Sequence, residues 1–147
     1  MKKALFAIAA MGLGASVLAA EATPVGTWRT IDDATKEAKS EVVISDRGGV
    51  LSGRVTKLLR KGADPEAVCD KCEGDRKDKR IVGLEIIRGA KKDAEANEWV
   101  GGNILDPEKG KVYKLVLTPT DGGKKLDVRG YVGARFMGRT QTWVRVQ

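Results

Sequence analysis

The chain contains no histidine, and this absence limits the chemistry that it can perform. Histidine is the commonest general base near neutral pH and the commonest metal-ligating side chain. Histidine-based catalytic triads and histidine-ligated metal centres are therefore excluded. A serine or cysteine nucleophile would also lack its usual activating base. We therefore expect a protein that is not an enzyme and that holds no metal or other cofactor.

Cysteine is nearly as scarce, because the only two lie together in VCDKCEGDRKDKR at residues 68–80. A structural zinc site takes four ligands, so carboxylates such as Asp70 or Asp75 would have to complete it. A thioredoxin-like redox site needs the pair at a helix start in a βαβ setting, which the flanking sequence does not offer. The basic neighbours could nevertheless stabilise a thiolate. The third possibility is a local disulfide between Cys69 and Cys72.

The amino-terminal residues have the layout of a secretory signal peptide. Lys2 and Lys3 precede an uncharged stretch that runs to Ala20. We expect cleavage after Ala20 or Ala22. The predicted organisation is then a signal peptide at 1–22 and one mature domain at 23–147.

Export has consequences for compartment, anchoring and cysteine chemistry. The apolar stretch is short for a membrane span, which needs about 20 residues. We therefore expect a bacterial periplasmic or secreted protein that does not span the membrane once mature. An oxidising compartment favours the disulfide.

The charge balance is modestly basic. The formal charge of +7 falls to +5 when residues 1–20 leave, or to +6 if Glu21 leaves too. Acids alternate with the basic residues, which is typical of a solvated surface and not of a nucleic-acid binder. Four cations of the segment around the cysteines are candidates for docking an acidic protein partner: Arg76, Lys77, Lys79 and Arg80.

Paired acids are the remaining candidates for catalysis, since glycosidases use two facing carboxylates. The available clusters are Asp32 with Asp33, Glu73 with Asp75, and Asp106 with Glu108. All three lie in predicted turns or links, where acidic residues serve local backbone geometry. A structural role is therefore the better interpretation.

Short segments of strand character follow the signal, and helical periodicity is almost absent. We expect eight strands, at residues 25–31, 41–46, 50–59, 81–88, 97–104, 111–118, 124–132 and 139–146. Glycine-rich or charged links separate them. The long link at 60–80 carries the cysteines and a possible helical turn at 65–68.

Alternation assigns one apolar face to the strands. Three sets of side chains each share a side: Val82, Leu84 and Ile86; Tyr113, Leu115 and Leu117; and Leu126, Val128 and Val132. Eight antiparallel strands with short links and one apolar face are best satisfied by an all-β, up-and-down barrel, which leaves no exposed edge. A two-sheet sandwich is the alternative.

Several segments together resemble a family of secreted bacterial proteins, domain of unknown function 2147. The matching segments are GTWRTIDD (26–33), VCDKCEGDRK (68–77), IVGLEI (81–86), ILDPEKGKVY (104–113), VRGYVG (128–133) and GRTQTW (138–143). The resemblance implies a lipocalin-like barrel outside the cytoplasm. It implies no established activity and no catalytic residues.

A second resemblance involves the two ends of the mature chain. Gly26-x-Trp28 and a late arginine, Arg145, are similar to the pair that closes lipocalin-type barrels. There the arginine lies across the tryptophan, an arrangement worth about 0.5–2 kcal/mol as a cation–π contact. Arg139 is an alternative partner for Trp28.

Binding is the function that these observations leave. Side chains that point into a barrel can line a small apolar cavity, and the candidates are Trp99, Tyr113, Leu115, Leu117, Tyr131 and Trp143. The leading hypothesis is an exported barrel that binds a small apolar or amphipathic ligand, or an envelope component, at its open end and the 60–80 link. The alternative is a protein-interaction module that docks an acidic partner through the same link.

Overall fold

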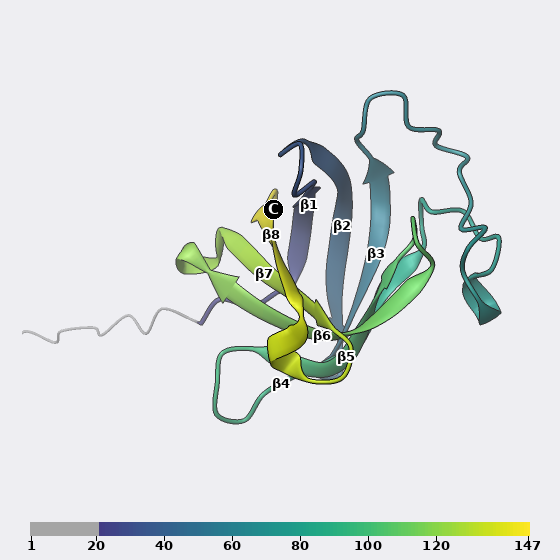
Figure 1. The fold of residues 1–147 in the computed structure, drawn as a ribbon. Coiled ribbons are helices and arrows are strands. Elements are labelled where there is room, and N and C mark those ends of the chain that lie inside the picture. Colours follow the sequence, from purple (N-terminus) through teal and green to yellow (C-terminus); the bar gives the residue numbers. More distant parts are fainter. Residues whose placement is uncertain (1–20) are drawn as a thin grey trace, which may run out of the picture.

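The computed structural model describes residues 21–147, which form a closed barrel of eight antiparallel strands (Figure 1). The strands are β1 (Gly26–Ile31), β2 (Ala38–Arg47), β3 (Val50–Leu58), β4 (Glu85–Lys92), β5 (Trp99–Asp106), β6 (Lys111–Thr120), β7 (Lys125–Tyr131) and β8 (Arg139–Arg145). Each strand pairs with the next, and β8 pairs with β1 through Trp28↔Arg145 and Arg29↔Val144. The predicted barrel is confirmed, and the sandwich is excluded. The predicted signal peptide lies outside the described residues except for Glu21 and Ala22.

Three short 3₁₀ turns lie in the links: η1 (Gly74–Arg76), η2 (Asp121–Gly123) and η3 (Arg135–Met137). The helical turn predicted at residues 65–68 does not form. That segment is turn and extended chain, and Val68 makes an isolated antiparallel bridge with Arg80. Among the described residues, no helix is long and apolar enough to cross a membrane.

The links divide the barrel into two ends. The β2–β3, β4–β5 and β6–β7 links lie at the end where Trp28 and Arg145 meet, called the closed end below. The β1–β2, β3–β4, β5–β6 and β7–β8 links lie at the other, called the open end. Figure 1 shows the β3–β4 link as the longest of them, extending well away from the strands.

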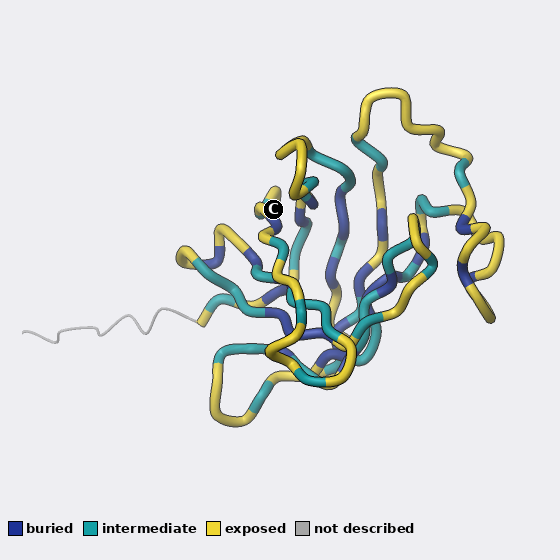
Figure 2. Tube along the Cα trace, viewed as in Figure 1, coloured by how far each residue is buried: buried dark blue, intermediate teal, exposed yellow. Residues whose placement is uncertain are grey.

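Burial follows the predicted alternation, with two corrections. Most of the buried residues lie on the strands, and the links are mostly exposed (Figure 2). Val132 was expected to face inward but is 70% exposed, because β7 ends at Tyr131 and Val132 belongs to the following link. Strand β4 starts four residues later than predicted. Residues 81–84 form a tight turn there, in which the Leu84 N–H donates to the Ile81 carbonyl and Gly83 has a φ of 95°.

The core fills the closed half of the barrel. Its fully buried large side chains are Trp28, Val42, Ile44, Leu51, Ile87, Leu115, Leu117 and Leu126. Close strand packing also needs glycine at Gly102, where a Cβ would collide with the backbone of Arg88 and Ala90 on β4. The closed half is therefore solid, and any interior space lies toward the open end.

Candidate functional site

A cavity of about 590 Å³ occupies the open half of the barrel. Eight strands give an interior just wide enough to be filled by side chains or to hold one small ligand, and this volume lies within the usual range for small-molecule sites, about 300–1,000 Å³. Exposed residues of the β3–β4, β5–β6 and β7–β8 links also line it, so the cavity opens to solvent at the open end.

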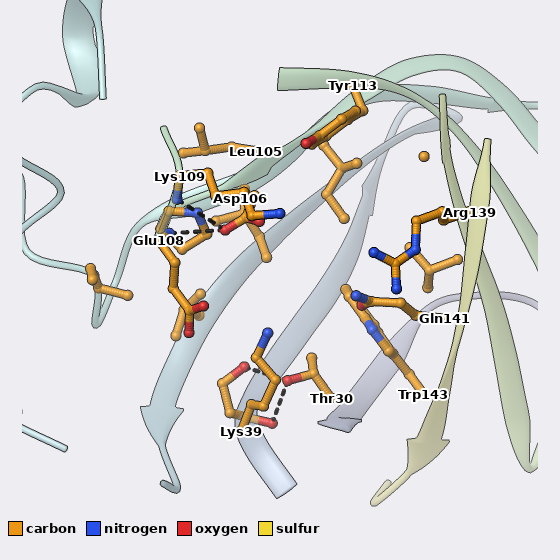
Figure 3. A pocket seen from close by; sticks show the side chains of 18 of the residues that line it. Thr30, Lys39, Leu105, Asp106, Glu108, Lys109, Tyr113, Arg139, Gln141 and Trp143 are labelled. Carbon is orange, nitrogen blue, oxygen red and sulfur yellow. Dashed lines mark hydrogen bonds between the residues drawn. The ribbon is translucent and has the colours of Figure 1, made fainter. Parts of the chain in front are cut away.

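The wall formed by β3 to β6 is mainly apolar. It contributes Val55, Leu58, Ile81, Ile86, Ile104, Leu105 and Tyr113. Figure 3 shows Leu105 and Tyr113 across the cavity from Thr30 and Lys39. This wall offers a ligand an extended hydrophobic surface, whose burial stabilises a complex by about 25 cal/mol per Å².

The opposite wall, from β8, β1 and β2, carries more polar side chains, with Trp143 as its apolar member. Arg139, Gln141 and Trp143 alternate along β8 and therefore share its inner face. Thr30 on β1 and Ser40 on β2 are joined by a hydroxyl–hydroxyl hydrogen bond of 2.7 Å. The cavity is thus two-sided, and it suits a molecule that has both an apolar and a polar part.

The acids at the open end are occupied locally. Asp106 accepts hydrogen bonds from the backbone N–H groups of Glu108 and Lys109. Glu108 pairs with Arg60 at 3.2 Å, and Asp64 accepts from the N–H of Glu66. These carboxylates order turns, as predicted for links.

The acids of the β1–β2 link behave in the same way. Asp32 accepts from the N–H groups of Thr35 and Ala34, and these bonds, with Arg60 nearby, hold the pKa of its carboxyl below the ordinary value. Asp33 instead pairs with Arg139, at 3.3 Å. Within residues 21–147, no three histidine, cysteine or acidic side chains are grouped so as to hold a metal ion.

Two lysines of the cavity wall have no carboxylate partner. Lys39 on β2 is half-buried, and Lys109 lies in the β5–β6 link. Neither makes an ion pair with any residue of the described chain. Asp64 and Asp106, which also line the cavity, make no ion pair with any described residue either, so the lining presents unpaired charges of both signs.

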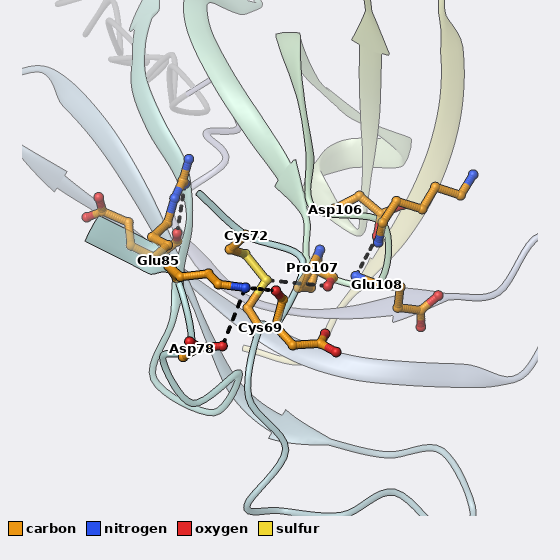
Figure 4. The surroundings of a disulfide bond; sticks show 11 residues. Cys69, Cys72, Asp78, Glu85, Asp106, Pro107 and Glu108 are labelled. Atoms are coloured by element: carbon orange, nitrogen blue, oxygen red, sulfur yellow. Dashed lines mark hydrogen bonds and ion pairs between the residues drawn. A yellow bond between two sulfur atoms is a disulfide. The ribbon is translucent and has the colours of Figure 1, made fainter. Parts of the chain in front are cut away.

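The disulfide is confirmed, and it braces the open end. Cys69 and Cys72 are bonded, with a Cα–Cα distance of 5.3 Å, and both are buried (Figure 4). The Cys69 sulfur lies 3.5 Å from the Pro107 carbonyl oxygen in the β5–β6 link. At Gly110 of the same link, an added Cβ would collide with the Lys71 backbone. The disulfide segment thus packs tightly against a second link that lines the cavity.

The closed end carries the predicted arginine–tryptophan pair. The Arg145 guanidinium carbon lies 4.2 Å from the centre of the Trp28 ring. Arg145 also donates to the carbonyls of Gly123, Val25 and Thr23 at 2.6, 2.9 and 2.8 Å. The alternative partner, Arg139, lies at the opposite end of the same strand face.

Of the six side chains predicted to line a cavity, Tyr113, Tyr131 and Trp143 do so. The other three do not. Leu115 and Leu117 are fully buried in the closed half. Trp99 starts β5 near the closed end, where the Lys92 ammonium lies 5.5 Å from its ring centre.

The basic residues predicted to dock a partner are largely engaged within the chain. Arg76 is buried and donates to the Glu85 carbonyl, so the prediction that it lies on a docking surface is wrong. Burial lowers the pKa of its guanidinium. Arg80 pairs with Glu66 at 3.0 Å, whereas Lys77 donates to a backbone carbonyl within its own link.

Sequence reasoning missed several cavity residues, and strand periodicity could have found three of them. Trp143 was expected in the cavity, and Gln141 and Arg139 precede it by two and four residues on the same strand, so strand periodicity gives them the same face. Thr30 follows Trp28 by two residues on β1 and carries the same signal. Lys39 carries none, because it is the residue skipped where the β1–β2 pairing shifts from Ser40 to Ala38.

Comparison with known proteins gives a family and a fold. A family model described as "Uncharacterized protein conserved in bacteria (DUF2147)" matches residues 26–145. The chain is also similar in structure to protein HP1028 from Helicobacter pylori, described as belonging to the lipocalin family. The TM-score is 0.72 at 16% sequence identity, over 86% of this chain and 84% of that one. None of the curated proteins that were compared matches the chain.

Proposed function

Because the chain belongs to DUF2147, a family of uncharacterised bacterial proteins, and folds as a lipocalin-like barrel, we propose that it is an exported binding protein that is not an enzyme. Its ligand is a small apolar or amphipathic molecule, or such a component of the cell envelope. The cavity at the open half of the barrel carries this proposal, since it combines a closed, filled end with a hollow end of ligand size.

The recognition surface is the open end together with the β3–β4 link. Arg60, Ala63, Asp64, Ala67 and Ile81 of that link line the cavity, and the disulfide braces the link against β5–β6. A preorganised rim lowers the entropy lost on binding. The ammonium groups of Lys39 and Lys109 on the cavity wall attract an anionic headgroup.

Native mass spectrometry of the protein purified from its own host tests the proposal. The expected result is an additional mass that disappears after lipid extraction, together with rebinding of an added amphiphile to the extracted protein. A protein that carries no ligand and binds no added hydrophobe would contradict it.

A further inference from the structure

One wall of the cavity contains a buried hydrogen-bond donor that lacks an acceptor. The ring of Trp143 carries a single polar group, the indole N–H, which can only donate. Trp143 is 2% exposed and lines the cavity, and its Nε1 has no hydrogen-bond partner among residues 21–147. The other buried side-chain atoms without a partner in this part of the chain, the amide oxygens of Asn97 and Asn103, belong to residues outside the cavity lining.

An unpaired buried donor is unusual and costly, because folding removes it from water without replacing the lost hydrogen bond. The barrel satisfies the same group elsewhere, since the buried Trp28 donates from its Nε1 to the Pro24 carbonyl at 2.7 Å. Trp143 is also held in place, because it pairs on β7 with Leu126, which is fully buried in the core. Its N–H is therefore a fixed donor that the described chain leaves unused.

The side chains around Trp143 on this wall offer further donors. The register of β1 with β8 places Thr30 beside Trp143. The Thr30 hydroxyl is bonded to that of Ser40, which Lys39 precedes on β2. Figure 3 shows Thr30 between Lys39 and Trp143. No acidic side chain of β1, β2 or β8 lines the cavity, so this wall suits a group that accepts hydrogen bonds.

The acids nearest to this wall are held elsewhere or come from other elements. Asp32, at the end of β1, lies close enough to Lys39 for the lysine to help lower its pKa, but its carboxylate is bonded to Arg60 at 2.8 Å. Asp64 and Asp106 belong to the β3–β4 and β5–β6 links.

From this arrangement we infer that the Trp143 N–H donates a hydrogen bond to an acyl oxygen of the bound molecule, in the carboxylate of an acid or the carbonyl of an ester. An acyl oxygen suits this donor because it accepts and carries no hydrogen that would need a partner of its own. The apolar tail then lies along the wall formed by β3 to β6, and Lys39 adds attraction for the acid alone. The inference rests on the proposed function, because it names the head group that the same cavity holds.

NMR of the full chain, as its host processes it and after lipid extraction, tests the inference. The three tryptophans give three indole N–H cross-peaks, and the spectrum of Trp143→Phe identifies the one that belongs to Trp143. Saturating dodecanoate or methyl dodecanoate should move the Trp143 indole proton downfield, as hydrogen bonding does. The Trp28 proton should not move, because it is already bonded to Pro24. Dodecylammonium should give no downfield shift at Trp143, because its head group has no lone pair to accept with.

Affinity provides the second readout. Trp143→Phe keeps an aromatic ring and removes the N–H, so binding of dodecanoate and of methyl dodecanoate should both weaken by about fivefold or more. Loss of ester binding separates this role from that of Lys39, which acts on the acid alone. The matched control is Trp99→Phe, which changes a tryptophan outside the cavity lining and should alter either affinity by less than about twofold. Competition with a fluorescent amphiphile measures the affinities, and circular dichroism establishes that each variant is folded.

Three results would overturn this inference and leave the proposed function intact. The acid and the ester could bind without a downfield shift at Trp143, they could bind Trp143→Phe as tightly as the wild type, or dodecylammonium could give the same shift. The NMR test uses the wild type, so it decides the question even if Trp143→Phe fails to fold, with the cross-peaks then assigned by through-space contacts. A wild type that binds no amphiphile at all would overturn the proposed function and this inference together.

Discussion

Arg139 and Arg145 lie on one face of β8, at opposite ends of the barrel. Their structural roles differ. Arg145 covers Trp28 and satisfies three backbone carbonyls from the amino-terminal segment and the β6–β7 link. Arg139 is 80% exposed in its side chain and forms one ion pair at the cavity rim. An exposed ion pair contributes little to stability, whereas a cation–π contact with buried Trp28 and a charged donor for the carbonyl of buried Gly123 contribute more.

Replacement of Arg145 by methionine should therefore destabilise the barrel. We expect the free energy of unfolding to fall by about 2 kcal/mol or more, because three carbonyls lose a charged donor and Trp28 loses its cover. Urea denaturation measures the change. Arg139→Met is the matched control, with an expected loss below about 0.5 kcal/mol. Equal losses in the two variants would contradict this role for Arg145.

Lys39 sets the preferred headgroup charge in the proposed function. Lys39→Met should weaken binding of dodecanoate by about fivefold, because an ammonium group is lost from the cavity wall. Binding of the neutral methyl ester should change by less than about twofold. Lys114→Met, on the exposed outer side of β6, is the control. Competition with a fluorescent amphiphile measures both affinities, and equal loss for acid and ester would contradict the assignment.

At the scale of elements, the β3–β4 link is the least regular part of the chain and yet is bound to the barrel at several points. The disulfide contacts the β5–β6 link, and Asp75 of η1 accepts two hydrogen bonds from Arg88 of β4, at 2.7 and 3.3 Å. These contacts position the residues of the link that line the cavity.

Removal of the disulfide should loosen the open end and leave the closed end unchanged. For Cys69→Ser with Cys72→Ser, the short loop predicts a loss of about 2 kcal/mol. Hydrogen exchange should quicken in residues 59–84 and 106–110, while β1 and β8 stay protected. Uniform quickening over all strands would show that the disulfide supports the whole barrel and not this end.

Low pH should weaken the contact between the β3–β4 link and strand β4. The hydrogen bonds from Arg88 hold the pKa of Asp75 below its ordinary value of 3.8. The Asp75–Arg88 pair therefore stabilises the folded link fully when the pH is above 3.8. This stabilisation is lost as the pH falls through the lower pKa that Asp75 has in the folded state. NMR shifts of the link should be constant from neutral pH to about pH 5 and change below about pH 4. In Asp75→Asn, the link should already be loosened at neutral pH; an acid transition that persists there would contradict this origin.

At the scale of the whole molecule, the barrel was predictable because its signals are local and repeated. Alternation, glycine-rich links and the pair of Trp28 with Arg145 all indicate the same closed sheet. The cavity was not predictable in detail, because interior volume depends on how all inward side chains pack together. Leu115 and Tyr113 have the same periodicity, yet one lies in the filled half and the other lines the cavity.

The departures from expectation also have physical causes. Arg76 belongs to a charged segment, which predicts exposure, but its side chain donates to the Glu85 carbonyl and is buried. Val132 continues an apolar alternation that the structure ends at Tyr131. Such outcomes depend on contacts between distant segments and have no signature in the local pattern.

The central claim is that the open half of this barrel is a binding cavity, and a cavity-filling substitution tests it most directly. Ile104 lines the cavity, so Ile104→Trp should occupy it, whereas Val112→Trp adds the same side chain at an exposed position on neighbouring β6. The measurement is equilibrium titration of each folded protein with anilinonaphthalene sulfonate. The account predicts saturable binding by the wild type and by Val112→Trp, and a loss of at least about 10-fold in affinity for Ile104→Trp. Equal affinity in all three proteins would contradict it.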